Sequence, residues 1–243
     1  MKVFLHGVPE TAAIWDDVRA AVDDESVTLA LPGFGCDRPD GFEATKDGYV
    51  AWVVDALEDI GEPVDLVGHD WGAGLTYRIA DAHGHLLRSW VADVGNIAHP
   101  HYVWHDFAQI WQRPGDGEAF FAAQRATAVE DLAAGYEAMG IPTAGAREMA
   151  AAGDEVMADS ILGLYRSAVP NPHADWGPWS PTVAPGMVLH VAGDPFGDER
   201  MARDVADQLG ACVGVLEGSG HFWPYEAPDA GAALLEEFWA GLD

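Results

Sequence analysis

Lysine is almost absent from this sequence. Only Lys2 and Lys46 occur among 243 residues, and the formal net charge is −28. Nucleic acids and anionic membrane surfaces are bound through basic patches, so this charge argues against both as partners. It also disfavours polyanionic substrates, apart from any that a local basic pocket could hold. The acidic composition itself is explained by a solvated surface that maintains solubility.

Cysteine and long apolar runs are scarce as well. Cys36 and Cys212 lie far apart and show neither a CxxC nor a zinc-ligand spacing, which predicts reduced, structural thiols. No apolar run is long enough to cross a bilayer, and residues 1–5 are too short for a signal peptide. We therefore expect a cytoplasmic protein. The sequence has no metal-ligand cluster and no phosphate-binding loop, so it implies no metal or organic cofactor.

What the sequence does contain is a regular alternation of strand and helix patterns. Its length and its 49% hydrophobic content suit one α/β domain with an insertion. Apolar runs predict strands at 2–5, 27–31, 64–67, 89–92, 187–192 and 211–216, and helical spacing predicts helices at 49–60, 75–83, 198–209 and 227–242. This alternation predicts a mostly parallel sheet with helices on both faces.

The alternation stops after residue 96. Residues 97–180 have no clear strand pattern, many aromatic residues and several helical patterns, and Pro170, Pro172 and Pro178 lie near their end. We therefore predict a helical cap at 97–180, inserted between two parts of an α/β core at 1–96 and 181–243.

One stretch, Gly68-His69-Asp70-Trp71-Gly72, lies between a predicted strand and a predicted helix. It has the G-x-S-x-G pattern of a nucleophile elbow, with Asp70 where serine is usual. The glycines matter because the sharp turn leaves no room for side chains beside the nucleophile. An isolated Asp at such a place more often caps the helix that follows. Here, however, other parts of a catalytic site occur in the right order along the chain.

Three further motifs accompany the elbow: His6-Gly7-Val8-Pro9-Glu10, Leu31-Pro32-Gly33-Phe34-Gly35 and Gly218-Ser219-Gly220-His221-Phe222. Together the four motifs resemble the α/β-hydrolase superfamily, in the branch with an aspartate nucleophile. That branch includes epoxide hydrolases, haloalkane dehalogenases and fluoroacetate dehalogenases. The resemblance implies an α/β-hydrolase fold with a helical cap. Relatives usually have one or two strands before the first motif, so we expect N-terminal strands to be shortened and a sheet edge that a homodimer could cover.

The residue types indicate a covalent mechanism. Asp70 is ionised at pH 7 and needs no base to activate it, unlike a serine nucleophile. Its attack on a saturated carbon gives a stable alkyl ester, which points to epoxides or alkyl halides. His221 is the candidate base for the water that hydrolyses this ester. Asp194 is the favoured carboxylate to orient His221. Asp93 is the alternative, although counted from Asp70 it is one residue short of the position that some dehalogenases use.

The leaving group decides between the two substrate classes. Epoxide hydrolases usually supply a proton to the epoxide oxygen from two cap tyrosines, and Tyr165 matches the second of these. Phe107 occupies the position of the first, and His105 could act in its place. On this basis we favour an epoxide hydrolase for a small hydrophobic substrate.

The resemblance also assigns the groups that stabilise charge. Backbone N–H groups of Val8 and Trp71 are placed to bind the oxyanion of the ester. A haloalkane dehalogenase would use the Trp71 indole N–H for the halide, with Trp104 or Trp111 replacing the Asn that relatives often have at the position of Val8. Fluoroacetate is disfavoured because the arginines that would hold its carboxylate are absent after Asp70.

A hypothesis from another class is a non-catalytic ligand-binding protein with this fold. Such proteins usually lose a member of the triad, whereas Asp70, His221 and a supporting acid are all present here. An esterase is disfavoured because neither Ser nor Cys occupies the elbow.

Overall fold

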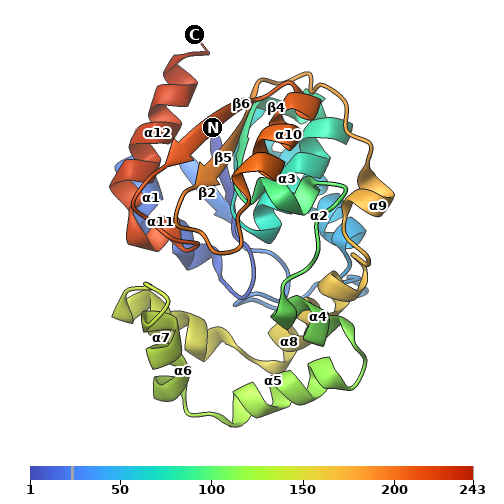
Figure 1. Cartoon of the computed structure of the whole chain (residues 1–243), viewed down its shortest axis with the longest axis vertical. Helices are drawn as coiled ribbons and strands as arrows, with labels where there is room; N and C mark the ends of the chain where they lie inside the picture. The colour runs from blue at the N-terminus through green and yellow to red at the C-terminus, as the bar shows by residue number, and fades with distance from the viewer. Residues whose placement is uncertain (23–24, 243) are drawn as a thin grey trace.

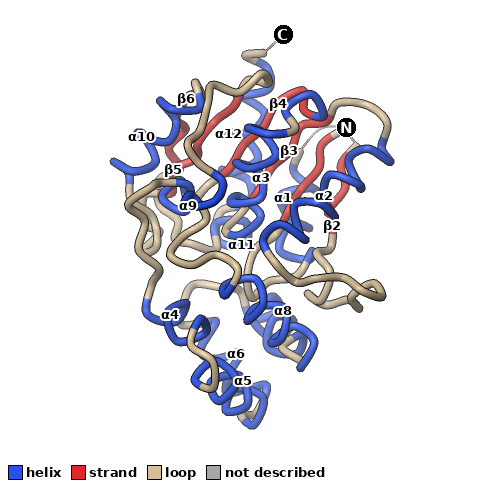
Figure 2. The backbone as a smooth tube through the Cα atoms, turned by 90° about the vertical axis from the view of Figure 1, so that its right-hand side faces the viewer, coloured by secondary structure: helices blue, strands red, loops and turns tan. Residues whose placement is uncertain are grey.

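The protein was analysed as a computed structural model that describes residues 1–22 and 25–242. Its centre is a six-stranded, wholly parallel sheet with the strand order β2-β1-β3-β4-β5-β6 (Figures 1 and 2). The strands are β1 (Lys2–Leu5), β2 (Ser26–Leu29), β3 (Val64–Gly68), β4 (Leu87–Ala92), β5 (Gly186–Val191) and β6 (Cys212–Leu216). All strands therefore end at one edge of the sheet, where parallel α/β folds place their ligands.

Successive residues of the central strands β1, β3, β4 and β5 pack into different hydrophobic clusters. Val3, Leu5 and Leu66 belong to one cluster, and Phe4 and Val67 belong to the other. Because neighbouring side chains in a strand point to opposite faces, the two clusters are the two sides of the sheet. Burial on both faces explains why the strands appear in the sequence as continuous apolar runs.

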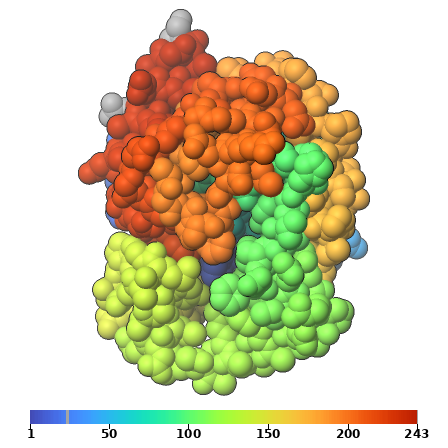
Figure 3. All heavy atoms as spheres, viewed as in Figure 1, coloured from blue at the N-terminus to red at the C-terminus, as the bar shows by residue number. Residues whose placement is uncertain are grey.

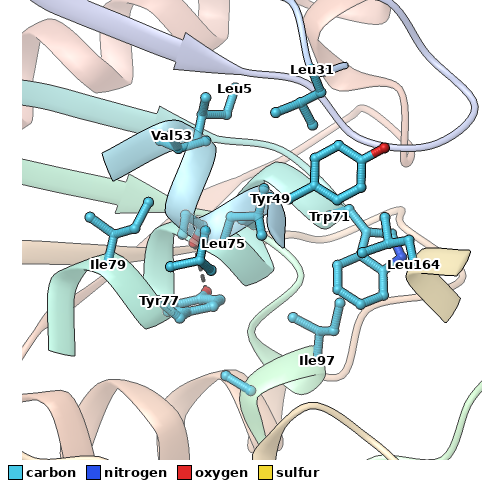
Figure 4. Close-up of a cluster of buried hydrophobic side chains, with 14 of the residues drawn as sticks. Leu5, Leu31, Tyr49, Val53, Trp71, Leu75, Tyr77, Ile79, Ile97 and Leu164 are labelled. Carbon is cyan, nitrogen blue, oxygen red and sulfur yellow. Dashed lines mark hydrogen bonds between the residues drawn. The ribbon is translucent and has the colours of Figure 1, made fainter. Parts of the chain in front are cut away.

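Helices cover both faces of the sheet (Figure 2). One face carries α2 (Lys46–Ile60), α3 (Trp71–Ala82) and α10 (Glu199–Leu209), and the other carries α1 (Asp16–Ala21), α11 (Trp223–Glu226) and α12 (Pro228–Ala240). Figure 4 shows how residues of α2 and α3 meet those of β1, and how Trp71 lies beside Leu164 of the cap.

Helices α2 and α3 begin earlier in the chain than the sequence predicted. Helix α2 begins before residue 49 because the Thr45 hydroxyl accepts a hydrogen bond from the Gly48 N–H at 3.1 Å, as an N-cap does. It ends at Gly61, whose φ of 80° suits a glycine at a helix C-terminus. Helix α3 begins at Trp71, directly after the elbow residue, rather than at residue 75.

The chain between β4 and β5 forms helices and no strand among its described residues. These helices are α4 (Asp106–Gln112), α5 (Asp116–Ala126), α6 (Val129–Glu137), α7 (Thr143–Ala152), α8 (Glu155–Arg166) and α9 (His173–Trp176). Helices α4 to α8 lie together at one end of the molecule, and α9 lies beside the core (Figure 1). We call residues 97–180 the cap.

Two expectations from composition can be compared with the structure. Cys36 and Cys212 are free, as expected, but both are exposed, so they are not part of the packed core. Across residues 1–22 and 25–242, none of the helices combines the length and the apolar character that crossing a membrane requires.

Candidate active site

Asp70 lies in a strained turn between β3 and α3. Its backbone has φ 51° and ψ −117°, in a region that non-glycine residues rarely adopt. The neighbouring glycines make this turn possible. A side chain at Gly72 would collide with the backbone oxygen of Leu5, and one at Gly68 would collide with that of Gly72. A side chain at Gly7 would overlap the Asp70 carboxylate, so the first motif also leaves space for that carboxylate.

The two carboxylate oxygens of Asp70 have different surroundings. Oδ1 accepts a hydrogen bond from the Val8 backbone N–H at 2.8 Å. Oδ2 lies 3.8 Å from Nε2 of His221. Burial raises the pKa of Asp70 to about 6, while the charges of His221 and His69 and the Trp71 backbone N–H act in the opposite direction. Oδ1 is thus held by the Val8 backbone N–H, and Oδ2 faces His221.

His221 is oriented by Asp194. Its Nδ1 lies 2.9 Å from Oδ2 of Asp194, which follows β5. Burial lowers the pKa of His221, but the hydrogen bond and charge of Asp194 outweigh burial, so the net pKa is raised. Asp194 is itself fixed by the Phe196 backbone N–H at 2.8 Å. The loop before His221 is held in turn by Glu226, whose Oε2 accepts the Gly220 N–H at 2.7 Å.

Asp93, the alternative acid, contacts different groups. Its Oδ2 lies 2.5 Å from Nδ1 of His69 and accepts the Trp223 indole N–H at 2.7 Å. Its Oδ1 accepts the backbone N–H of Asp70 at 2.9 Å. Among the described residues, no hydrogen bond joins Asp93 to His221. The geometry therefore favours Asp194 as the partner of His221 and makes Asp93 a support for the elbow.

His69 and Glu10 are two buried residues near Asp70 for which the sequence alone predicted no role. His69 lies between Asp93 and Glu10, with Nε2 3.3 Å from Oε1 of Glu10. Burial lowers the pKa of His69, but the two carboxylates outweigh it and hold the pKa well above its usual value. Both residues belong to matched motifs, so their positions were visible, but nothing local in the sequence showed that they would pair.

Glu10, His69 and His221 could also be considered as metal ligands. Their candidate ligand atoms all lie within 4.8 Å of one another. His69 Nδ1 lies 2.5 Å from Oδ2 of Asp93, and His221 Nδ1 lies 2.9 Å from Oδ2 of Asp194, so both rings are held by carboxylates outside this group of three. We describe the cluster as a group of buried ion pairs.

A cavity of about 200 Å³ opens beside Asp70, between the core and the cap. Figure 3 shows the molecule hollowed between these two parts. The cavity is lined largely by apolar and aromatic side chains, and its volume is below the range of about 300–1,000 Å³ for drug-sized ligands. It therefore suits a small hydrophobic molecule.

Three tyrosines line this cavity: Tyr165 of α8, Tyr136 of α6 and Tyr102. Tyr165 and Tyr102 are the two whose pKa values respond to the charge of Asp70. Burial raises the pKa of both, and the charge of Asp70 raises both further, so both hydroxyls lie within electrostatic reach of the nucleophile. Within residues 1–22 and 25–242 neither hydroxyl makes a hydrogen bond of normal geometry, although the Trp71 indole N–H lies close enough to the Tyr165 hydroxyl to lower its pKa. Tyr165 was a candidate from the sequence, whereas Tyr102 was missed. Tyr102 lies in a segment without helix or strand, where no periodicity indicates which way a side chain faces.

The other cap candidates differ in what they can donate. Phe107 is 52% exposed and lines the cavity without any polar group. His105 also lines it. Burial and the charge of His221 lower the pKa of His105 to about 4, so the ring is neutral at pH 7. Its Nδ1 accepts the Ala108 N–H at 3.3 Å, which leaves the hydrogen on Nε2. His105 can thus donate a hydrogen bond, but it is not charged.

The candidate tryptophans differ in whether their indole N–H already donates a hydrogen bond. The Trp104 indole N–H donates to the Ala168 carbonyl at 2.9 Å. Trp111 lines the cavity, and its indole nitrogen is buried without a partner among the described residues. Trp71 is fully buried and stacks on Trp104 with ring centroids 5.4 Å apart. Its indole N–H lies close enough to lower the pKa of Tyr165 but makes no hydrogen bond of normal geometry.

Comparison with known proteins identifies the family. The model of the alpha/beta hydrolase family matches residues 3–234, so the chain belongs to that family. A curated relative, the AB hydrolase superfamily protein YfhM of Bacillus subtilis (strain 168), is 28% identical over 114 residues, which are 42% of this chain and 37% of YfhM. The match therefore spans little more than a third of that protein's length.

Solved structures share the fold over almost the whole chain. A Pseudomonas aeruginosa protein provisionally named an epoxide hydrolase has a TM-score of 0.79 at 22% identity, covering 99% of this chain and 88% of that one. A loop variant of the haloalkane dehalogenase DbeA from Bradyrhizobium elkanii has a TM-score of 0.71 at 20% identity, covering 99% of this chain and 89% of that one. At these identities the likeness shows the fold, and it confirms the predicted α/β-hydrolase class.

Proposed function

We propose that this protein hydrolyses small hydrophobic epoxides through an ester on Asp70. The observation that carries the proposal is the environment of that carboxylate. Oδ1 is bound by the Val8 N–H, Oδ2 is free beside His221, and the same cavity contains two tyrosines without hydrogen-bond partners. This arrangement matches an attacking oxygen, a base for water and acids for a leaving oxygen.

The first step forms the ester. Oδ2 of Asp70 attacks an epoxide carbon, and the bond between that carbon and the ring oxygen breaks. The ring oxygen takes a proton from Tyr165 or Tyr102, and the tyrosinate is neutralised by a proton from water. Esterification removes the charge of Asp70. Because that charge raises the pKa of both tyrosines, its loss makes their protons easier to transfer.

The second step hydrolyses the ester. His221 takes a proton from a water molecule, which attacks the carbonyl carbon of the Asp70 ester. The oxyanion forms on Oδ1, where the Val8 and Trp71 backbone N–H groups bind it. Collapse of this intermediate breaks the bond between the carbonyl carbon and the ester oxygen and releases the diol, whose leaving oxygen takes the proton from His221. The carboxylic acid left on Asp70 releases its remaining proton to the solvent, which replaces the proton that the tyrosinate took from water, and the carboxylate is regenerated. Asp194 stabilises the charged form of His221 during this step.

A haloalkane dehalogenase remains the second candidate because of one observation. The indole nitrogens of Trp71 and Trp111 are both buried without a hydrogen-bond partner in the described part of the chain. Two free N–H donors would suit a halide, which needs hydrogen bonds but no proton. We rank this function second because it gives no role to Tyr102 and Tyr165.

Turnover of a matched pair of substrates tests the proposal. Wild-type protein is expected to convert styrene oxide to its diol and to release no bromide from 1-bromobutane. Asp70→Ala is expected to lower epoxide turnover by about 10⁴-fold or more because the nucleophile is lost. The exposed Asp207→Asn variant serves as the matched control and should retain wild-type activity. Bromide release without diol formation would instead establish the dehalogenase.

A further inference from the structure

Two polar side chains of the cap line the cavity without a role in the chemistry. Gln124 lies on α5 and Tyr136 on α6. Both also line a smaller neighbouring pocket of about 20 Å³. They therefore lie at the boundary between the two spaces. The smaller pocket is too small for more than a water molecule or two, so this pair closes the cavity on that side.

This pair has unused hydrogen-bonding capacity. The Gln124 amide donates to the Tyr136 hydroxyl at 3.4 Å, a long hydrogen bond. Neither side chain makes another hydrogen bond to the parts of the chain that the structure describes. The Gln124 oxygen, its second N–H and the Tyr136 O–H are consequently available to a ligand. In a cavity lined mainly by aromatic rings, such groups determine which substrate orientation is favourable.

The charges around the pair favour a neutral ligand group. Neither Lys nor Arg lines the cavity within the described residues. The charge of Glu10 helps burial to raise the pKa of Tyr136, so the hydroxyl stays protonated as a donor. A carboxylate or phosphate on the substrate would meet this negative charge, whereas a hydroxyl, ether or carbonyl oxygen would meet donors and an acceptor.

We propose that Gln124 and Tyr136 form a second recognition site, which binds a neutral oxygen carried at the far end of the substrate from the reacting carbon. The substrate class is then an epoxide with a distal hydroxyl, ether or carbonyl group. This inference rests on the proposed function for the reaction at Asp70, but binding at the second site does not require that reaction.

The test compares two isosteric epoxides, 1,2-epoxyoctane and 6,7-epoxyheptan-1-ol, in which a hydroxyl replaces the terminal methyl group. Dissociation constants are measured by calorimetry with Asp70→Asn protein, which holds the ligand without turnover. Homologous epoxy-alcohols with shorter and longer chains locate the best distance. The matching epoxy-acid, 6,7-epoxyheptanoic acid, tests for an anionic group, which Arg125 of the smaller pocket would favour.

The expected result is that one epoxy-alcohol of the series binds more tightly than its methyl counterpart. Adding Gln124→Leu or Tyr136→Phe should weaken its binding about 3- to 10-fold, the usual effect of one hydrogen bond, and should change the methyl counterpart less than twofold. Adding Gln208→Leu on α10, remote from the cavity lining, is the matched control and should change neither.

Two results would overturn this inference: a preference for the methyl compound at every chain length, or equal losses for both ligands in the two variants. Tighter binding of the epoxy-acid would also overturn it and point to Arg125. Turnover by wild-type protein is measured separately. Absence of diol with an intact binding preference would contradict the proposed function alone.

Discussion

The two walls of the cavity differ in how their polar groups are satisfied. On the core wall, Asp70, His221 and Asp194 form one chain of contacts, and Asp93 joins His69 to the elbow. On the cap wall, the hydroxyls of Tyr102 and Tyr165 lack partners within the described residues. A wall whose carboxylates are held by hydrogen bonds is preorganised for a fixed reaction, and a wall with free donors is ready for groups of the substrate. We infer that the core sets the chemistry and the cap sets what is transformed.

The largest effect on kcat is expected from the substitutions that distinguish the roles of the two core carboxylates, Asp194 and Asp93. Asp194→Asn is expected to lower kcat by about 10³- to 10⁴-fold, as loss of the orienting acid does in other triads. Because Asp194 raises the pKa of His221, its loss should also move the acidic limb of the kcat profile to lower pH. Measuring kcat for styrene oxide against pH checks both expectations.

Asp93→Asn provides the contrasting variant. It breaks the buried contact with His69, so we expect it to lower the free energy of unfolding by about 3–5 kcal/mol, measured by denaturant titration. If Asp93→Asn lowered the pKa of His221 while Asp194→Asn left it unchanged, the roles assigned to the two acids would be reversed.

An intermediate effect is expected on the cap wall. Tyr165→Phe should lower kcat/KM for styrene oxide by about 10- to 100-fold, because it removes one proton donor to the leaving oxygen. The double variant Tyr102→Phe/Tyr165→Phe removes both donors and should lower kcat/KM by about 10²- to 10⁴-fold. Binding of the diol product, measured by calorimetry, should change much less. Loss of diol binding in parallel with kcat/KM would show that the tyrosines only shape the cavity.

The smallest effect concerns the charge behind the nucleophile. The cation of His69 lowers the pKa of both Asp70 and His221. In His69→Gln this cation is absent, so both pKa values should rise, and the acidic limb of kcat/KM should move to higher pH by up to about one unit. The exposed His85→Gln variant should leave the profile in place. A shift to lower pH in His69→Gln would contradict this electrostatic role.

The contrast between the core wall and the cap wall also explains which features the sequence could predict. The elbow and the loop before His221 require glycine at particular places, so the backbone imposes a local pattern around Asp70 that can be recognised without the structure. Buried strands and amphipathic helices likewise have a periodicity. These features allowed the α/β-hydrolase fold and the positions of its strands to be predicted.

Fewer of the cavity-lining residues of the cap could be predicted, because tertiary packing decides which of its side chains face the cavity. Tyr102 was missed because it lies in an irregular segment. Phe107 lines the cavity as expected, although its side chain is 52% exposed. The pairing of His69 with Asp93 and Glu10 joins residues from three separate segments, so no spacing in the sequence reveals it. Contacts of this kind become visible only when the chain is folded.

The most direct test of the account is to trap the ester. His221→Gln protein is incubated with styrene oxide, and intact-protein mass spectrometry followed by peptide mapping locates any adduct. We expect a stable adduct on Asp70 with the full mass of the epoxide, since ring opening loses no atoms, and no adduct in Asp70→Ala/His221→Gln. Full turnover by His221→Gln, or an adduct on a residue other than Asp70, would contradict the covalent mechanism.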